Sequence, residues 1–205
     1  MDTPDFKFIF LGQSVLRYKV PLDMYKIINH IYETKYSTLS QANGHLINFG
    51  RSLFFEGEDS DKIKQHNLLP DNVIQWFEEK FKHYLDWNGI KKYKLNLNMI
   101  WVNQMLKHEY TPIHIHQGML LTGLSSVMIL KLPELLDNNQ NGKLQILGAA
   151  NGQFAKIDYQ PKLKERDFYV FPYDMRHGVY PFNGSGIRRS LSANMDVEYD
   201  PIKNR

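Results

Sequence analysis

The sequence contains no cysteine among its 205 residues. This absence excludes a disulfide framework, a metal site built from thiolates and a cysteine nucleophile. The chain also has no glycine-rich phosphate loop, no dinucleotide-binding fingerprint and no Gly-x-Ser-x-Gly turn that would carry a serine nucleophile. Any chemistry must therefore come from other side chains.

Long apolar runs are missing as well. No stretch approaches the ~20 apolar residues that a membrane-spanning helix needs. The apolar run 8–11, which follows an acidic amino-terminal segment, is too short for the core of a signal peptide. We therefore expect a soluble, cytoplasmic protein with no membrane partner.

Charge of one sign is also scarce. The formal net charge is only +3, and the Lys and Arg residues are spread along the chain among acidic residues. A basic arm or stripe, which is the usual footprint of a nucleic-acid-binding protein, is not visible. We therefore expect no nucleic-acid partner.

Patterns of apolar residues predict two helices followed by many strands. Helical spacing begins at Pro21 and again at about Pro70, where it continues to Trp87 and is followed by Gly89. Period-two alternation begins at Tyr93, and no long helical period follows residue 90. The expected strands cover residues 6–20, 46–55, 93–101, 113–116, 121–132, 143–147, 168–171 and 187–197. Together they predict a mostly β protein in which N-terminal helices pack on a β-sandwich or jelly roll.

The length fits a single domain covering residues 1–205. Within it, we expect residues 1–92 to form a supporting region of helices and strands. The change of pattern near residue 93 marks the start of the predicted jelly-roll core, residues 93–205.

A His-x-His motif is the strongest chemical signal. In a strand, His114 and His116 point to the same face, with Cα atoms roughly 6.6 Å apart. Two imidazoles at this spacing can bind one metal ion, with a third ligand from another strand. His177, which follows the apolar run 168–171, is the best candidate. The alternative is a polar surface pair or a hydrogen-bonded pair in the core.

A second signal lies in the last predicted strand. Arg188, Ser190, Ser192 and Asn194 share one face of that strand. A guanidinium that points inward is costly without a partner, and a carboxylate ligand gripped by Arg188, with a hydroxyl from Ser190, would provide one. The alternative is a surface strand with a basic end.

These motifs resemble the Fe(II)- and 2-oxoglutarate-dependent oxygenases, and most closely a subgroup found in bacteria and phages. In that subgroup, Trp-x-Asn precedes His-x-His and Leu-Ser-Gly, and later come Phe-Pro, His-x-Val-x-Pro and Arg-x-Ser-x-Ser-x-Asn. The resemblance covers the chain from residue 93 onward. The matching residues here are Trp101-Val102-Asn103, His114-Ile115-His116, Leu121-Thr122-Gly123, Phe171-Pro172, His177-Gly178-Val179-Tyr180-Pro181 and Arg188-Arg189-Ser190-Leu191-Ser192-Ala193-Asn194.

The resemblance implies a double-stranded β-helix, which is a jelly roll, flanked by helices. It implies that His114 and His177 bind Fe(II), with His116 at the position where most relatives have a carboxylate ligand. These three histidines are thus the expected metal ligands and catalytic centre. Arg188 and Ser190 match the grip on 2-oxoglutarate, and Asn103 would line the pocket.

The implied activity is hydroxylation of a small-molecule or peptidyl substrate, with 2-oxoglutarate converted to succinate. Three neutral imidazoles also suit Zn, Cu and Ni, so the residues alone leave the metal open. Two alternatives also remain: a cupin-like three-histidine metalloprotein that does not use 2-oxoglutarate, and a jelly-roll binding or structural module without activity. The substrate and the oligomeric state are not readable from the sequence.

Overall fold

The computed structural model describes residues 6–10, 13–35, 39–42, 51–55, 69–134, 141–148 and 157–200. In these ranges the chain is mostly β, with two helices. The helices are α1 (Leu22–Lys35) and α2 (Asp71–Trp87). The strands are β1 (Phe6–Phe10), β2 (Ser14–Lys19), β3 (Leu39–Ala42), β4 (Arg51–Phe55), β5 (Tyr93–Met105), β6 (Thr111–His114), β7 (Gly123–Lys131), β8 (Leu144–Leu147), β9 (Asp158–Tyr159), β10 (Asp167–Pro172), β11 (Arg176–Val179) and β12 (Arg188–Tyr199).

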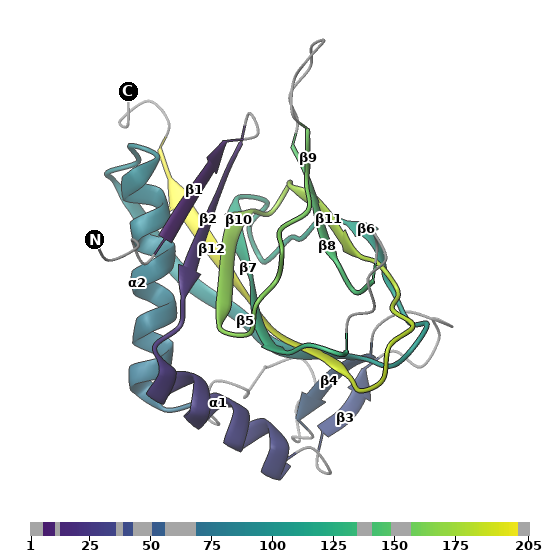
Figure 1. Cartoon of the computed structure of the whole chain (residues 1–205). Coiled ribbons are helices and arrows are strands. Elements are labelled where there is room, and N and C mark those ends of the chain that lie inside the picture. The colour runs from purple at the N-terminus through teal and green to yellow at the C-terminus, as the bar shows by residue number, and fades with distance from the viewer. Residues whose placement is uncertain are drawn as a thin grey trace, which may run out of the picture.

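The strands form two sheets. The larger has eight strands in the order β1-β2-β10-β7-β12-β5-β4-β3, and the smaller has four in the order β6-β11-β8-β9. Strands from the first 92 residues extend the larger sheet at both edges. Figure 1 shows the two helices on one side of the larger sheet and the smaller sheet on the other.

Alternating side chains of the larger sheet fill two cores. Apolar residues on one face of β2, β5, β7, β10 and β12 pack with α1 and α2. Apolar residues on the other face of β2, β7 and β10 meet the smaller sheet. In β12, Leu191, Ala193 and Met195 belong to the helix-side core. Because side chains alternate along a strand, Ser190, Ser192 and Asn194 face the interior between the sheets. The fold therefore directs a row of polar groups into an enclosed space.

The two predicted helices are confirmed. Gly89 follows α2 with a φ of 80°, a left-handed conformation that is typical of a helix end. The face of α2 that meets the sheet consists of Val73, Trp76, Phe77, Phe81, Tyr84 and Leu85, all of which are buried. On α1, helical spacing also predicts Ile27 on the buried apolar face with Met24, Ile28 and Tyr32. The latter three are buried, but Ile27 is 40% exposed, so this part of the prediction is wrong.

Several strand predictions need correction. Residues 6–20 form two antiparallel strands, β1 and β2, instead of one. β6 ends at His114, so the predicted strand 113–116 is wrong at its end. The short strands β3, β9 and β11 were not predicted, and β4 covers only the end of the predicted strand 46–55, whose residues 46–50 lie outside the described ranges. Short strands are missed because a few residues cannot establish a period.

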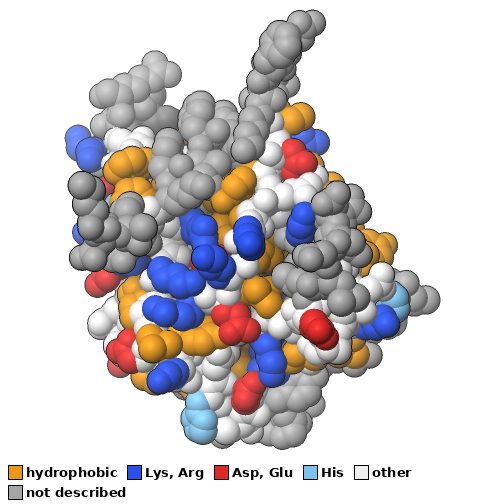
Figure 2. All heavy atoms as spheres, viewed as in Figure 1, with side chains coloured by type: hydrophobic (Ala, Val, Ile, Leu, Met, Phe, Trp, Pro, Cys, Tyr) orange, Lys and Arg blue, Asp and Glu red, His pale blue; other side chains and the backbone are white. Residues whose placement is uncertain are grey.

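A cluster of charges links β2 and β10. The fully buried Asp167 carboxylate lies 2.8 Å from the Arg17 guanidinium and 3.4 Å from the Lys19 ammonium. Burial of a carboxylate is tolerated when it is paired in this way. On the face shown in Figure 2, Lys and Arg side chains gather near the centre, with acidic and hydrophobic side chains around them.

Phe168 joins α2 to the sheet, and its truncation is expected to be strongly destabilising. The ring is fully buried and has its centroid 5.1 Å from those of both Trp76 and Phe77. Phe168→Ala should lower the free energy of unfolding by about 3–5 kcal/mol, through lost burial and a residual cavity. Urea denaturation measures the loss. Phe168→Leu, which keeps most of the volume, should cost clearly less, and equal losses in both variants would contradict this packing role.

Candidate metal and cosubstrate site

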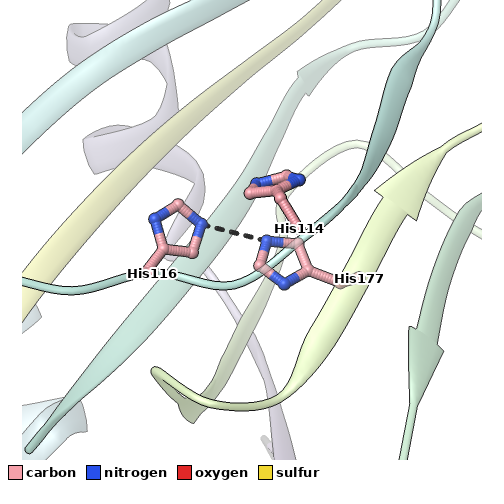
Figure 3. A group of neighbouring side chains, drawn as sticks. All are labelled: His114, His116 and His177. Atoms are coloured by element: carbon pink, nitrogen blue, oxygen red, sulfur yellow. Dashed lines mark hydrogen bonds between the residues drawn. The ribbon is translucent and has the colours of Figure 1, made fainter.

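Three imidazoles from separate elements meet between the sheets. His114 ends β6, His177 lies in β11, and their Cα atoms are register partners across the two strands. The ligand nitrogens of His114, His116 and His177 all lie within 4.8 Å of one another, and Figure 3 shows the rings grouped together. The Nε2 atoms of His116 and His177 are 3.0 Å apart. Neighbouring ligands at right angles, each about 2.1 Å from a metal, would be separated by about 3 Å, so the spacing fits a metal centre.

Backbone carbonyls orient two of the rings. His114 Nδ1 lies 2.8 Å from the Pro112 oxygen, and His177 Nδ1 lies 2.9 Å from the Met175 oxygen. Because a carbonyl oxygen only accepts, each Nδ1 must donate a proton, which leaves the Nε2 lone pair available to a metal. Asp174 and Arg176, which flank His177 in the sequence, do not provide this contact.

His116 is held differently. It lies beyond the end of β6, where its backbone N–H donates to the Tyr173 oxygen at 2.9 Å. Its ring is tilted against Trp101, with a centroid separation of 5.5 Å, and its Nδ1 lies 3.5 Å from Nδ2 of Asn194. The third imidazole therefore reaches the cluster from an irregular segment and has a side-chain partner instead of a carbonyl.

The surroundings keep the buried rings neutral. Burial lowers the pKa of His116 to about 3, and repulsion from His114 adds to this effect. Burial also lowers the pKa of His177 well below its ordinary value, with further repulsion from His114 and His116. Neutral imidazole is the form that binds metals, so neither ring has to lose a proton before it can bind a metal at neutral pH.

The same shifts predict acid sensitivity of the metal-free protein. Between about pH 6.5 and pH 3, the unfolded chain binds protons at these histidines that the folded chain does not, so stability rises with pH in this window. Above pH 6.5 the contribution is constant. We expect the free energy of unfolding to fall on acidification from pH 7 to pH 5, by up to about 1.4 kcal/mol per pH unit for each group. Urea titrations check this, and the slope should be shallower in His116→Leu.

Arg188 is a buried cation on the interior face of β12. Its Nε donates to the Gly142 oxygen at 3.1 Å and its Nη1 to the Ser190 hydroxyl at 3.4 Å. Nη2 is buried and has no hydrogen-bond partner among the described residues. Burial lowers the Arg188 pKa to about 10, which is still high enough to keep the charge, and Tyr169 acts in the opposite direction. A buried guanidinium nitrogen without a partner fits an anionic ligand such as a carboxylate.

The other predicted pocket residues are Ser190, which lies on β12 with Arg188, and Asn103, which lies on the neighbouring strand β5. Ser190 accepts the hydrogen bond from Arg188, and its register partner on β5 is Asn103. Asn103 is partly buried and donates to the Ser192 hydroxyl at 3.4 Å. The predicted residues thus form two groups: the histidine cluster, and the interior side chains of β12 and β5. Asn194 connects the two groups, because it lies on β12 and contacts His116.

One neighbouring group was missed from the sequence. The Asp196 carboxylate is buried, accepts from the Tyr173 hydroxyl at 3.1 Å and accepts from the Met119 backbone at 3.0 Å. A side chain at Gly118 would collide with this carboxylate. Asp196 therefore fixes the segment that follows His116. Continuing the alternation of β12 beyond Asn194 would have identified it.

Comparison with known proteins agrees with the cluster. A family model described as "Putative 2OG-Fe(II) oxygenase" matches residues 99–194, a stretch that includes all three histidines, Arg188, Ser190 and Asn103. Over these residues, which are a little under half of the chain, the sequence is similar to the 2-oxoglutarate- and Fe(II)-dependent oxygenases. Proteins of that family depend on Fe(II) and on the cosubstrate 2-oxoglutarate. No curated protein matches this chain in sequence.

Solved structures share its fold. A Pseudomonas putida prolyl-4-hydroxylase is 12% identical with a TM-score of 0.59, over 90% of this chain and 92% of that chain. The non-haem α-ketoglutarate-dependent epimerase SnoN from nogalamycin biosynthesis is 11% identical with a TM-score of 0.64, over 92% and 81% of the two chains. HygX from Streptomyces hygroscopicus, solved with nickel, 2-oxoglutarate and hygromycin B, is 9% identical with a TM-score of 0.59, over 90% and 83%. At these identities the likeness shows the fold alone.

The described helices provide no candidate for a transmembrane segment, since none of them combines sufficient length with an apolar composition.

Proposed function

We propose that this chain binds Fe(II) through His114, His116 and His177, binds 2-oxoglutarate through Arg188 and Ser190, and hydroxylates a small-molecule or peptidyl substrate. The three histidines would form the catalytic centre, and Asn103 would line the pocket. When bound, Fe(II) and 2-oxoglutarate supply the oxidising chemistry, in which the cosubstrate becomes succinate. The protein's own contribution is to orient these groups and to exclude water.

The observation that carries the proposal is the unpartnered Nη2 of Arg188. A buried cation without a carboxylate partner is costly, and the cost is relieved when an anion binds. 2-Oxoglutarate carries a distal carboxylate that can accept from a guanidinium at two oxygens. A cupin-like site without this cosubstrate has no need for such a cation, so the observation favours the oxygenase over that alternative.

The three imidazoles would bind the metal as neutral ligands. A usual site of this class has two histidines and one carboxylate. With His116 in the third position, the protein ligands leave the full charge of the cation uncompensated, and the cosubstrate dianion would supply the compensation. This arrangement predicts that metal and cosubstrate binding support each other.

Other parts of the proposal concern the architecture and the setting. We interpret the facing strands β5–β12 as a double-stranded β-helix within one domain of residues 1–205, with residues 1–92 as support and residues 93–205 as the core that carries the site. We also propose a cytoplasmic location without nucleic-acid or membrane partners, which the lack of a basic stripe and of a long apolar run supports. The likeness in fold to a prolyl-4-hydroxylase and to HygX leaves both peptidyl and small-molecule substrates open.

An anaerobic titration tests the proposal. Adding 2-oxoglutarate to the Fe(II)-loaded protein should produce a metal-to-ligand charge-transfer band in the visible spectrum. Succinate should be released when oxygen is admitted. If no band forms and no succinate appears, the assignment of the cosubstrate site is wrong, whereas metal binding by the histidines would be judged separately from the metal content.

A further inference from the structure

A chain of hydrogen bonds links Asn194 to the proposed metal ligands. Asn194 Nδ2 lies 3.5 Å from His116 Nδ1, His116 Nε2 lies 3.0 Å from His177 Nε2, and His177 Nδ1 lies 2.9 Å from the Met175 oxygen. The carbonyl fixes the proton of His177 on Nδ1, so its Nε2 must accept. His116 must then carry its proton on Nε2 and accept from the Asn194 amide at Nδ1. Each donor in this chain meets an acceptor.

This tautomer of His116 cannot bind a metal. The nitrogen that faces the cluster carries the proton, whereas a ligand imidazole needs a free lone pair there and an N–H at the other nitrogen. That N–H would then point at Nδ2 of Asn194, which is also a donor. His114 and His177 avoid the conflict because carbonyl oxygens accept from their Nδ1 atoms.

Asn194 carries the acceptor that the other tautomer needs. The residue is 2% exposed, and its Oδ1 has no hydrogen-bond partner among the described residues. Rotation of the amide by half a turn exchanges Nδ2 and Oδ1, so Oδ1 would face His116 Nδ1. The neighbouring ring of Trp101 cannot replace it, because an indole nitrogen is only a donor.

We infer that Asn194 is a positioning residue for the metal site: its amide holds His116 in a non-ligating tautomer before metal binding and, after rotation, accepts from Nδ1–H so that Nε2 can bind the ion. The inference rests on the proposed role of His116 as a ligand. Most oxygenases have a carboxylate ligand at the position of His116, and a carboxylate has no tautomers. An imidazole at this position needs a partner that selects its ligating tautomer, and Asn194 is that partner.

Metal titrations test the role of Asn194. They are done without 2-oxoglutarate, so that a contact between Asn194 and the cosubstrate cannot contribute to the measured affinity. Co(II) affinity should fall about 10–100-fold in Asn194→Leu, as is usual when the partner of a ligand imidazole is lost. Asn194→Asp, which can only accept when ionised, should bind Co(II) at least as tightly as the wild type. A merely structural role predicts that both variants weaken binding. Ser192→Ala, on the same face of β12, is the matched control and should stay within about two-fold.

The coupling to His116 is measured by a double-mutant cycle. In a His116→Ala background, Asn194→Leu should cause no further loss of Co(II) affinity. If His116→Ala itself leaves the affinity unchanged, the ligand assignment fails. If His116→Ala weakens binding while Asn194→Leu does not, the ligand assignment stands and the inference about Asn194 is overturned.

Imidazole tautomers provide a readout that does not depend on affinity. Long-range ¹H–¹⁵N correlation spectra of the metal-free protein should show His116 protonated at Nε2, and spectra of the Zn(II)-loaded protein should show it protonated at Nδ1. Metal-free Asn194→Asp should already show the Nδ1–H form, which also reports on a folded site. The signal is assigned by its loss in His116→Ala. A metal-free wild type with Nδ1–H, or a loaded protein bound through Nδ1, would contradict the inference.

Discussion

Replacing His177 by alanine is expected to abolish metal binding. Its ring is 3% exposed, lies against both other imidazoles and has its Nδ1 oriented by the Met175 carbonyl. The remaining histidines, His114 and His116, would leave the ion with only two of its three proposed protein ligands. Metal content measured by elemental analysis should fall from near one ion per chain to background, and succinate production should fall with it.

Two further variants make this result interpretable. His177→Gln keeps much of the side-chain volume, so it separates loss of a ligand from loss of packing against Phe171. His30→Ala, on the exposed side of α1, should leave metal content unchanged. Unchanged metal content in both His177 variants would show that the cluster is not the metal site.

Replacing Arg188 by methionine is expected to separate stability from cosubstrate binding. The guanidinium is held at about 1% exposure with an unpartnered Nη2, and burial lowers its pKa from 12.5 to about 10. A shift of this size corresponds to roughly 3 kcal/mol lost by burying the charge. Methionine of similar length should therefore leave the Tm of the protein without cosubstrate unchanged or higher.

Affinity for 2-oxoglutarate should change in the opposite direction. Removing one partner of a buried charge pair costs roughly 2–5 kcal/mol, so we expect affinity to fall by about two to three orders of magnitude. The charge-transfer titration measures this loss, and metal content should stay at the wild-type level.

The adjacent Arg189 offers a matched control for the Arg188 variant. Its side chain lies on the opposite face of β12 and donates to the Gln104 side chain at 3.0 Å. Arg189→Met should lower the Tm and leave 2-oxoglutarate binding intact. An Arg188→Met protein that binds the cosubstrate as tightly as the wild type would remove the main support for the proposed cosubstrate site.

The sequence predicted those parts of the site that depend on alternation along a strand. Because side chains alternate, the row from Arg188 to Asn194 could be placed on one face. The structure agrees, since the intervening Leu191 and Ala193 pack in the helix-side core, whereas Arg188 contacts Ser190 and Asn194 contacts His116. The grouping of His177 with His114 and His116 is also found. His177 was selected because it follows the apolar run 168–171, and the family resemblance supported the choice, since spacing alone does not say which strands pair.

Other parts could not be predicted because they depend on backbone groups or on local irregularity. The acceptors for His114 and His177 are carbonyl oxygens, which every residue has, so no residue type signals them. β6 ends at His114 instead of continuing through His116, and β12 has a register shift between Asn194 and Met195. A short strand such as β11 is defined by its neighbours on either side and not by its own four residues.

The two faces of β12 contact two different layers, and this limits the insertions and deletions that the strand can tolerate. Its odd-numbered residues from Leu191 to Val197 pack with the helices, while the even-numbered residues carry the polar row. Insertion or deletion of a single residue would exchange the two faces. Leu191 would then point into the proposed cosubstrate pocket, and Arg188 would point into the apolar core beneath the helices. Divergence towards new substrates is therefore confined to the connecting segments, while the length of this strand is fixed by having to satisfy both layers at once.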